Sequence, residues 1–222
     1  MEQESVIKNL RKVLKNMPND WLNLTTHRLD IYDESQAKTQ FLENFEELIE
    51  KNKLHASALN NLPTAFDYIR LGHPLSCVLE WSIARLNNLP ADSLISFGSK
   101  MAPILAILRK NLFEQKNTRI LYKNSLPIFF NSEKLTKVYG YLFTLQKIDK
   151  TDTINAFEGS TVLLSQQNKL SDFEVNSNID FILNIHDELG SILIVNGKQN
   201  GHYISEIQHV RRRETIAMTP IN

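Results

Sequence analysis

Apolar and polar positions along the chain follow two spacings, one typical of helices and one of buried strands. In the first 62 residues, apolar side chains recur every three or four positions and leave a polar face between them. This spacing predicts two amphipathic helices. Their apolar residues are Val6, Leu10, Val13 and Leu14 in the first helix and Phe41, Leu42, Phe45, Leu48 and Ile49 in the second.

The connection between these helices contains turn residues, and residues 29–32 favour a short extended segment. Ser35 is an N-cap candidate for the second helix, because its hydroxyl can accept a hydrogen bond from a first-turn amide. Each apolar face must be covered. The cover is either the rest of the same chain or a second subunit.

Residues 68–108 combine a turn, a helix, a short strand and a second helix. Pro74 suits a helix start, and apolar residues then recur at helical spacing up to Leu86. The mostly apolar residues 94–97, Leu-Ile-Ser-Phe, predict a short buried strand. Gly98 and Ser99 form a turn before a second helix, which Met101 and the apolar residues up to Leu108 indicate.

Strand-like and helix-like segments alternate through the rest of the chain. Strands are predicted around residues 120–122, 143–148, 161–164 and 192–195, and helices at 132–139 and through Ile179, Ile182, Leu183 and Ile185. The alternation predicts an α/β fold with a partial, doubly wound and mostly parallel sheet and helices on both faces. We expect residues 1–62 to form a helical N-terminal extension and residues 63–222 to form the α/β domain.

Composition narrows the class of protein. The chain has 222 residues, 42% of them hydrophobic, which suffices for one sizeable core. Its 25 basic and 25 acidic residues balance, so charge predicts neither a nucleic-acid nor a membrane partner. Cys77 is the single cysteine and cannot form an internal disulfide. With no apolar run of roughly 18 residues, the expectation is a soluble cytoplasmic protein.

Familiar catalytic motifs are missing from the sequence. It contains no GxGxxG or GxxxxGK[ST] pattern for a nucleotide. His186, His202 and His209 lack the spacing of a zinc site, so no metal is expected. Ser99 lacks a nucleophile elbow, and helix capping is its predicted role. No catalytic residue is therefore assigned.

The turn after the predicted strand 94–97 is a candidate anion site. A helix start presents free backbone N–H groups, and the helix dipole favours negative charge there. The Ser99 hydroxyl adds a donor, and Lys100 adds a positive charge. An oxyanion is therefore predicted to bind at Gly98, Ser99 and Lys100.

Several short motifs occur in the order found in the Cys/Met-metabolism enzymes that depend on pyridoxal phosphate (PLP), such as cystathionine synthases and lyases. The chain resembles the N-terminal half of the large domain of these fold-type-I enzymes over about residues 66–203. The motifs are Tyr68-Ile69-Arg70, Gly72-His73-Pro74, Leu79-Glu80 with Ala84 and Leu86, Ser99-Lys100-Met101-Ala102, and more faintly His186 to Asn196.

The resemblance implies a set of residues at a cofactor site, and it also shows departures from the family. The implied cofactor-binding residues are Tyr68, Arg70, Gly98, Ser99, Lys100, Met101 and Asn196. Asn196 stands where the family has the aspartate that pairs with the pyridinium nitrogen. Ser125 to Pro127 stand where the stacking tyrosine is expected, and Lys100 replaces a glycine. No lysine follows Lys198, although the family's Schiff-base lysine lies beyond that aspartate.

These departures favour a noncatalytic protein related to the PLP-dependent trans-sulfuration enzymes, acting by binding a partner or a phosphorylated ligand. The alternative is the N-terminal fragment of a split enzyme of sulfur amino-acid metabolism. No covalent cofactor is expected, and PLP is expected only if another chain completes the site. The expected partner is a second copy or a complementing chain, with no nucleic acid and no membrane.

Overall fold

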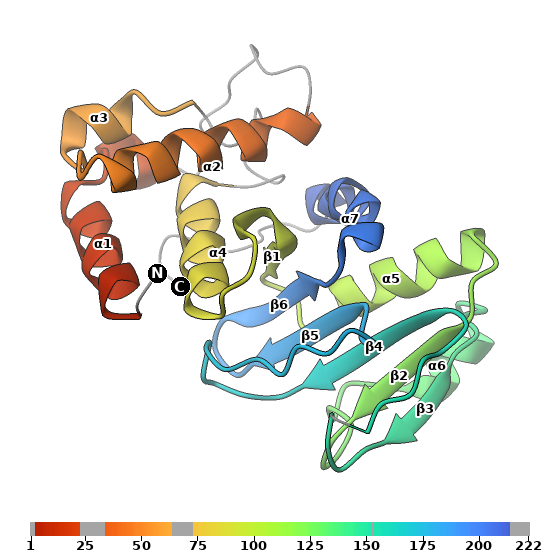
Figure 1. The fold of residues 1–222 in the computed structure, drawn as a ribbon. Coiled ribbons are helices and arrows are strands. Elements are labelled where there is room, and N and C mark those ends of the chain that lie inside the picture. Colours follow the sequence, from red (N-terminus) through yellow and green to blue (C-terminus); the bar gives the residue numbers. More distant parts are fainter. Residues whose placement is uncertain (1–2, 23–33, 64–72, 152, 214–222) are drawn as a thin grey trace.

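The computed structural model describes residues 3–22, 34–63, 73–151 and 153–213. In this part of the chain, six strands form one sheet in the order β1-β6-β5-β4-β2-β3 (Figure 1). β2 pairs in parallel with β3 and β4, and β4 pairs in parallel with β5. β6 is antiparallel to both of its neighbours. The strands are β1 (Leu94–Phe97), β2 (Thr118–Tyr122), β3 (Thr144–Lys147), β4 (Ser160–Ser165), β5 (Phe181–His186) and β6 (Gly190–Val195).

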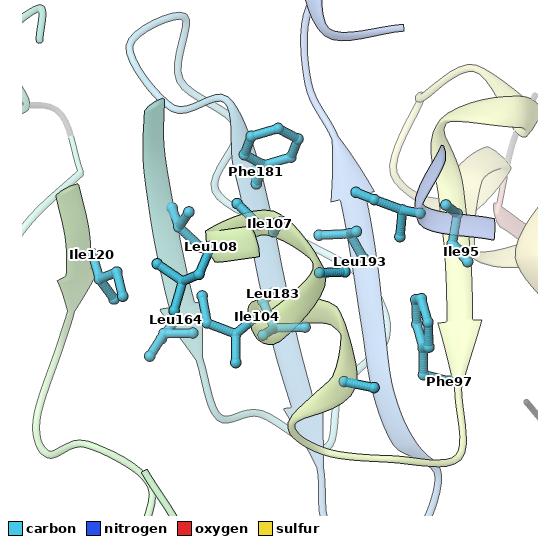
Figure 2. Close-up of a cluster of buried hydrophobic side chains, with 14 of the residues drawn as sticks. Ile95, Phe97, Ile104, Ile107, Leu108, Ile120, Leu164, Phe181, Leu183 and Leu193 are labelled. Atoms are coloured by element: carbon cyan, nitrogen blue, oxygen red, sulfur yellow. The ribbon is translucent and has the colours of Figure 1, made fainter. Parts of the chain in front are cut away.

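Helices cover both faces of this sheet. The α-helices are α1 (Gln3–Asn16), α2 (Glu34–Glu50), α3 (Ala56–Asn60), α4 (Pro74–Leu86), α5 (Ala102–Phe113), α6 (Ser132–Lys137) and α7 (His202–Arg213). On one face, α5, α6 and α7 bury apolar side chains against alternate residues of the strands. Figure 2 shows Ile104, Ile107 and Leu108 of α5 directed at Leu164, Leu183 and Leu193. On the other face, α4 packs against the strands together with the β4–β5 connection.

The predicted α/β fold with a mostly parallel sheet is confirmed. β1 spans the predicted residues 94–97. The helix predicted through residues 179–185 is wrong, because residues 181–186 form β5. All six residues of β5 are buried, since both faces of the sheet are covered. A strand buried on both faces carries a continuous apolar run that helical spacing also fits.

The N-terminal helices pack on α4 of the same chain and share a core with it. Val6 and Val13 of α1 are fully buried beside Phe45 of α2 and Trp81 of α4. The same chain therefore covers most of the two predicted apolar stripes, while Leu14 remains exposed. α2 begins at Glu34, so Ser35 lies inside its first turn and is not the N-cap. The extended segment predicted at residues 29–32 lies outside the described residues.

A buried ion pair fastens α2 to α4 and β1. The Lys38 ammonium of α2 lies 2.7 Å from Oε2 of Glu80 in α4, and both side chains are almost completely buried. Oε1 of Glu80 accepts hydrogen bonds from the backbone N–H of Ser96 at 2.8 Å and from its hydroxyl at 2.7 Å. The N-terminal helices thus connect to the sheet through charge as well as through apolar packing.

None of the helices in the described ranges is long and apolar enough to cross a membrane.

Candidate ligand crevice

The order of the strands creates a switch point between β2 and β4. These strands are adjacent and parallel, yet their following connections leave toward opposite faces of the sheet. After β2, Leu135 of α6 packs on the face that α5 covers. After β4, Leu170 and Phe173 pack on the face that α4 covers. In open α/β sheets, ligands bind in the crevice that such diverging connections leave outside the carboxyl ends of the strands.

A cavity of about 210 Å³ lies at this switch point. Its apolar floor includes Leu163 of β4, Ile182 of β5 and Phe173 of the β4–β5 connection, all buried. Polar groups form its rim; they come from the residues that follow β2, from the end of β4 and the residues after it, and from Glu174 in the β4–β5 connection. The complete lining is Lys123, Asn124, Ser125, Leu163, Leu164, Ser165, Gln166, Gln167, Phe173, Glu174 and Ile182.

The rim carries one ion pair. The Lys123 ammonium donates a hydrogen bond to Oε1 of Glu174, and the Thr151 hydroxyl donates to Oε2. The bond from Lys123 lowers the pKa of the Glu174 carboxyl, and the bond from Thr151 adds to this effect. Glu174 is therefore ionised near neutral pH, so the crevice presents one positive and one negative group with no net charge.

Side-chain amides hold the two connections of the crevice in place. Gln166 Nε2 donates to the carbonyl oxygen of Ser125 at 2.9 Å and so joins the segments that follow β2 and β4. Asn184 of β5 is fully buried, and its amide pairs with the backbone of Gln167. Its Oδ1 accepts from the Gln167 N–H at 3.1 Å, and its Nδ2 donates to the Gln167 carbonyl at 3.0 Å. The crevice is therefore preformed.

The sequence did not predict this crevice. Lys123, Gln166 and Glu174 belong to no motif, and they come together only through the strand order. One signal was present in the sequence. Polar residues directly follow two predicted strands, at Lys123 and at Ser165 to Gln167. The carboxyl ends of neighbouring parallel strands lie at one edge of a sheet, but the sequence did not show that these two strands are neighbours.

The predicted anion turn lies at the same edge of the sheet, after β1. The Ser99 hydroxyl accepts hydrogen bonds from the backbone N–H groups of Met101 at 3.1 Å and Ala102 at 3.0 Å. Lys100 Nζ donates to the carbonyl oxygen of Asp187 at 3.0 Å. Met101 is the N-cap of α5, so the prediction of Ser99 as the N-cap residue is wrong by two positions. The Ser99 hydroxyl nevertheless accepts from the amides at the start of the helix. An oxyanion at this turn would compete with the Ser99 hydroxyl for two amides.

Asn196 lies at the opposite edge of the sheet. β6 begins with Gly190 at the carboxyl edge and ends with Val195, which pairs with Phe181 at the start of β5. A six-residue strand is roughly 17 Å long, so the structure does not bring Asn196 to the turn. Its Nδ2 donates to the carbonyl oxygens of Asn176 at 2.9 Å and Ile179 at 2.6 Å.

The residues that the resemblance assigns to PLP do not converge in the described part of the chain. Gly98 to Met101 lie at one edge of the sheet and Asn196 lies at the other. Tyr68 and Arg70 lie outside the described residues. Among the residues that are described, no group of three or more histidine, cysteine or acidic side chains is placed to hold a metal ion.

The fold and the crevice define an α/β protein with an open, mostly parallel sheet and a small polar opening at its switch point. Solved structures to which this chain is similar include a cystathionine gamma-lyase from Lactobacillus plantarum complexed with L-serine, at 17% identity and a TM-score of 0.43, covering 69% of this chain and 50% of that one. A cystathionine gamma synthase from Xanthomonas oryzae pv. oryzae in complex with aminoacrylate and cysteine is 12% identical with a TM-score of 0.45, covering 72% and 51%.

A third similar structure is metB from Corynebacterium glutamicum, at 14% identity and a TM-score of 0.41, covering 69% of this chain and 54% of that one. The chain thus spans about half the length of the solved structures that it matches. No model of a known protein family matches the chain, and no curated protein matches it.

Proposed function

We propose that this chain is a noncatalytic binding protein whose site is the crevice between the carboxyl ends of β2 and β4. Its ligand is a small zwitterion of the size of a free amino acid. The observation that carries the proposal is the pair of opposite charges, Lys123 and Glu174, at the rim of one preformed opening.

The charge of the crevice favours a zwitterion over a simple ion. A lone anion is attracted by Lys123 but repelled by the ionised Glu174. A lone cation is attracted by Glu174 but repelled by Lys123. A ligand with both charges can place its carboxylate at Lys123 and its ammonium at Glu174. Amides and hydroxyls of the rim, including Asn124 and Ser165, can complete the hydrogen bonds, while the apolar floor receives a short side chain. A cavity of about 210 Å³ suits a ligand smaller than a typical drug.

The same lining supports binding better than covalent catalysis. A serine nucleophile needs an adjacent base. The described lining contains Ser125 and Ser165 but no histidine, and its one carboxylate already accepts from Lys123 and Thr151. Binding in the crevice requires no further chain, whereas a split PLP enzyme requires a second polypeptide. A test of ligand binding by the isolated chain therefore distinguishes a noncatalytic binding protein from the fragment of a split enzyme.

Amide NMR of the isolated chain tests the proposal. The probes are serine, which carries both charges, together with acetate and ethylamine, which carry one each. We expect serine to shift the amides of residues 123–125 and 165–167 in a saturable way, and the single ions to bind far more weakly. Lys123→Gln and Glu174→Gln should each lower the affinity about tenfold, a change of about 1.4 kcal/mol.

Lys134→Gln provides the matched control, because Lys134 is an exposed lysine of α6 outside the crevice. It should leave serine binding unchanged. Equal binding of acetate and serine, or serine shifts that cluster elsewhere in the molecule, would overturn the proposal. Serine binding that appears only after a second polypeptide is added would favour the split enzyme.

A further inference from the structure

The wall of the crevice that carries Glu174 is held from outside by Asn87, the C-cap residue of α4. Nδ2 of Asn87 donates hydrogen bonds to the carbonyl oxygen of Ile83 in its own helix at 2.7 Å and to that of Leu170 at 2.9 Å. Its Oδ1 accepts from the backbone N–H of Phe173 at 3.0 Å. One side-chain amide thus joins the end of α4 to the β4–β5 connection.

The two backbone groups that Asn87 binds in this connection lie on either side of a bend at Ser171. In many tight turns, the carbonyl of the first residue accepts directly from the N–H of the fourth. Here the amide of Asn87 bonds to both groups instead, at Leu170 and at Phe173. Asp172 between them has a φ of 62°, which is uncommon for a residue with a side chain. The bend therefore keeps its shape through a partner outside it.

The residues that follow this bend form part of the crevice. Phe173 is buried in the apolar floor, and Glu174 carries the negative charge of the rim. The bond from the Phe173 N–H to Asn87 fixes the backbone from which the Glu174 side chain starts. The cation of the rim, Lys123, comes from the opposite wall, after β2. The placement of the two charges relative to each other therefore involves a residue of α4.

We infer that Asn87 is the positioning residue for Glu174, and that it thereby sets the preference of the crevice for a ligand with an ammonium group. The inference rests on the proposed binding of a zwitterion. Asn87 acts through the connection, because it does not line the crevice. A charge-assisted hydrogen bond from an ammonium to a carboxylate is short and directional, so it weakens when the carboxylate is displaced.

A pair of matched ligands distinguishes this role from general support of the fold. Serine carries an ammonium group, and glycerate carries a hydroxyl in its place. In the parent chain we expect serine to bind at least about tenfold more tightly than glycerate, as measured by amide NMR titration. In Asn87→Ala the preference should fall to about threefold or less, because Glu174 is no longer held in place. An unchanged preference in folded Asn87→Ala would overturn the inference.

Asn178→Ala is the matched control. Asn178 belongs to the same β4–β5 connection, and its Nδ2 donates to the carbonyl oxygen of Ile154 at 2.8 Å. It lies outside the lining of the crevice. The variant removes an amide–carbonyl bond of the same kind and should keep the parent's preference for serine. An equal loss of preference in Asn178→Ala would overturn the assignment to Asn87.

Hydrogen exchange in the parent chain gives a measurement that does not depend on the folding of a variant. A ligand that binds Glu174 should stabilise the adjacent bond from the Phe173 N–H to Asn87 and slow the exchange of that amide. Unchanged exchange of the Phe173 amide at saturating serine would overturn the inference.

The inference and the proposed function fail in different ways. If serine does not bind the parent chain, the proposed function fails, and the pKa of the Glu174 carboxyl then decides whether Asn87 positions it. We expect Asn87→Ala to raise this pKa, because the carboxylate moves away from Lys123, whose hydrogen bond lowers it. An unchanged pKa in Asn87→Ala would show that Asn87 does not position Glu174.

Discussion

Lys38 and Glu80 join three elements through charges that are removed from water. The two side chains are 3% and 0% exposed, and β1 supplies two hydrogen bonds to Glu80 through Ser96. Both oxygens of the carboxylate are therefore engaged. Removing one member of such a buried pair leaves the other charge without compensation, which costs far more than the pair contributes as a unit.

Replacement of the cation should therefore be severe. We expect Lys38→Met to lower the free energy of unfolding by about 3–5 kcal/mol, as measured by urea denaturation. The double variant Lys38→Met with Glu80→Leu should recover part of this loss, because no unpaired charge remains. Lys137→Met, which breaks the exposed pair with Glu133 on α6, is the control and should have little effect. A loss in Lys38→Met no larger than in this control would contradict the argument.

Glu174 gives the crevice a pH dependence whose sign follows from its partner. Lys123 lowers the folded-state pKa of Glu174 below its ordinary value of 4.5. The contribution of the pair to stability is present above the unfolded-state pKa and is lost as pH falls through the folded-state pKa.

We expect Lys123→Gln to raise the pKa of Glu174, as followed by side-chain carboxyl NMR. The variant should also lose less stability than the parent chain between about pH 6 and pH 3. The Thr151 hydroxyl bond remains in the variant, so part of the lowering should persist. An unchanged pKa in Lys123→Gln would mean that the pair does not form in solution.

The sequence predicted contacts between residues that are close in the chain, and it did not predict contacts between residues that are far apart in the chain. The Ser99 hydroxyl bonds to amides two and three residues away, and a role at the start of α5 was predicted, although Met101 is the N-cap. The partners of Glu174 lie far from it in sequence, at Lys123 and Thr151. Single residues carry no signal for such pairs until the order of the strands is known.

The Ser99 hydroxyl supports the first turn of helix α5. α5 covers the sheet beside β6, so fraying of its first turn would loosen that core. We expect Ser99→Ala to lower the free energy of unfolding by about 1 kcal/mol and to speed hydrogen exchange at the amides of Met101 and Ala102.

Thr136→Ala on α6 serves as the comparison for this variant. The Thr136 hydroxyl donates to carbonyl oxygens of its own helix, a contact that adds little stability. Denaturation curves of Ser99→Ala and Thr136→Ala that coincide would show that the Ser99 hydroxyl does not support α5.

The elements themselves were predictable to different degrees. Helices with one solvated face, such as α1 and α2, have a polar side that marks their period. β5 has no such polar side, since all of its residues are buried. Its polar residue Asn184 accepts a hydrogen bond from the backbone N–H of Gln167. Its buried apolar run therefore could not be distinguished from a helix by spacing alone.

At the scale of the whole molecule, exposed apolar side chains gather around α6 and the edge strand β3. We name this the α6–β3 surface; it comprises Ile128, Phe129, Val138, Tyr139, Leu142 and Leu145. β3 lies at the end of the sheet, and all four of its residues are exposed. An exposed edge strand with apolar neighbours favours association between chains.

We therefore expect self-association at a concentration of about 50 μM, as measured by light scattering, and expect it to depend on the α6–β3 surface. Leu142→Asp with Leu145→Lys should shift the chain toward the monomer. Phe113→Asp on α5, which changes an exposed aromatic residue away from this surface, should not. Most apolar side chains of α1 and α2 pack within the same chain, so these helices are not the expected contact. A parent chain that is monomeric at this concentration would contradict the prediction.

The position of β1 has a consequence for the order in which the chain folds. Among the described residues, β1 pairs with β6 alone, which is the last strand of that part of the chain, with Leu94 opposite Ile194. During synthesis, β1 thus has no pairing partner until residues 190–195 have left the ribosome. Pairing across so long a loop is slow, and unpaired apolar strands are prone to aggregation meanwhile. The buried bonds of Glu80 with Ser96 already tie β1 to α4, so the helical half of the molecule can shelter this strand before the sheet is complete.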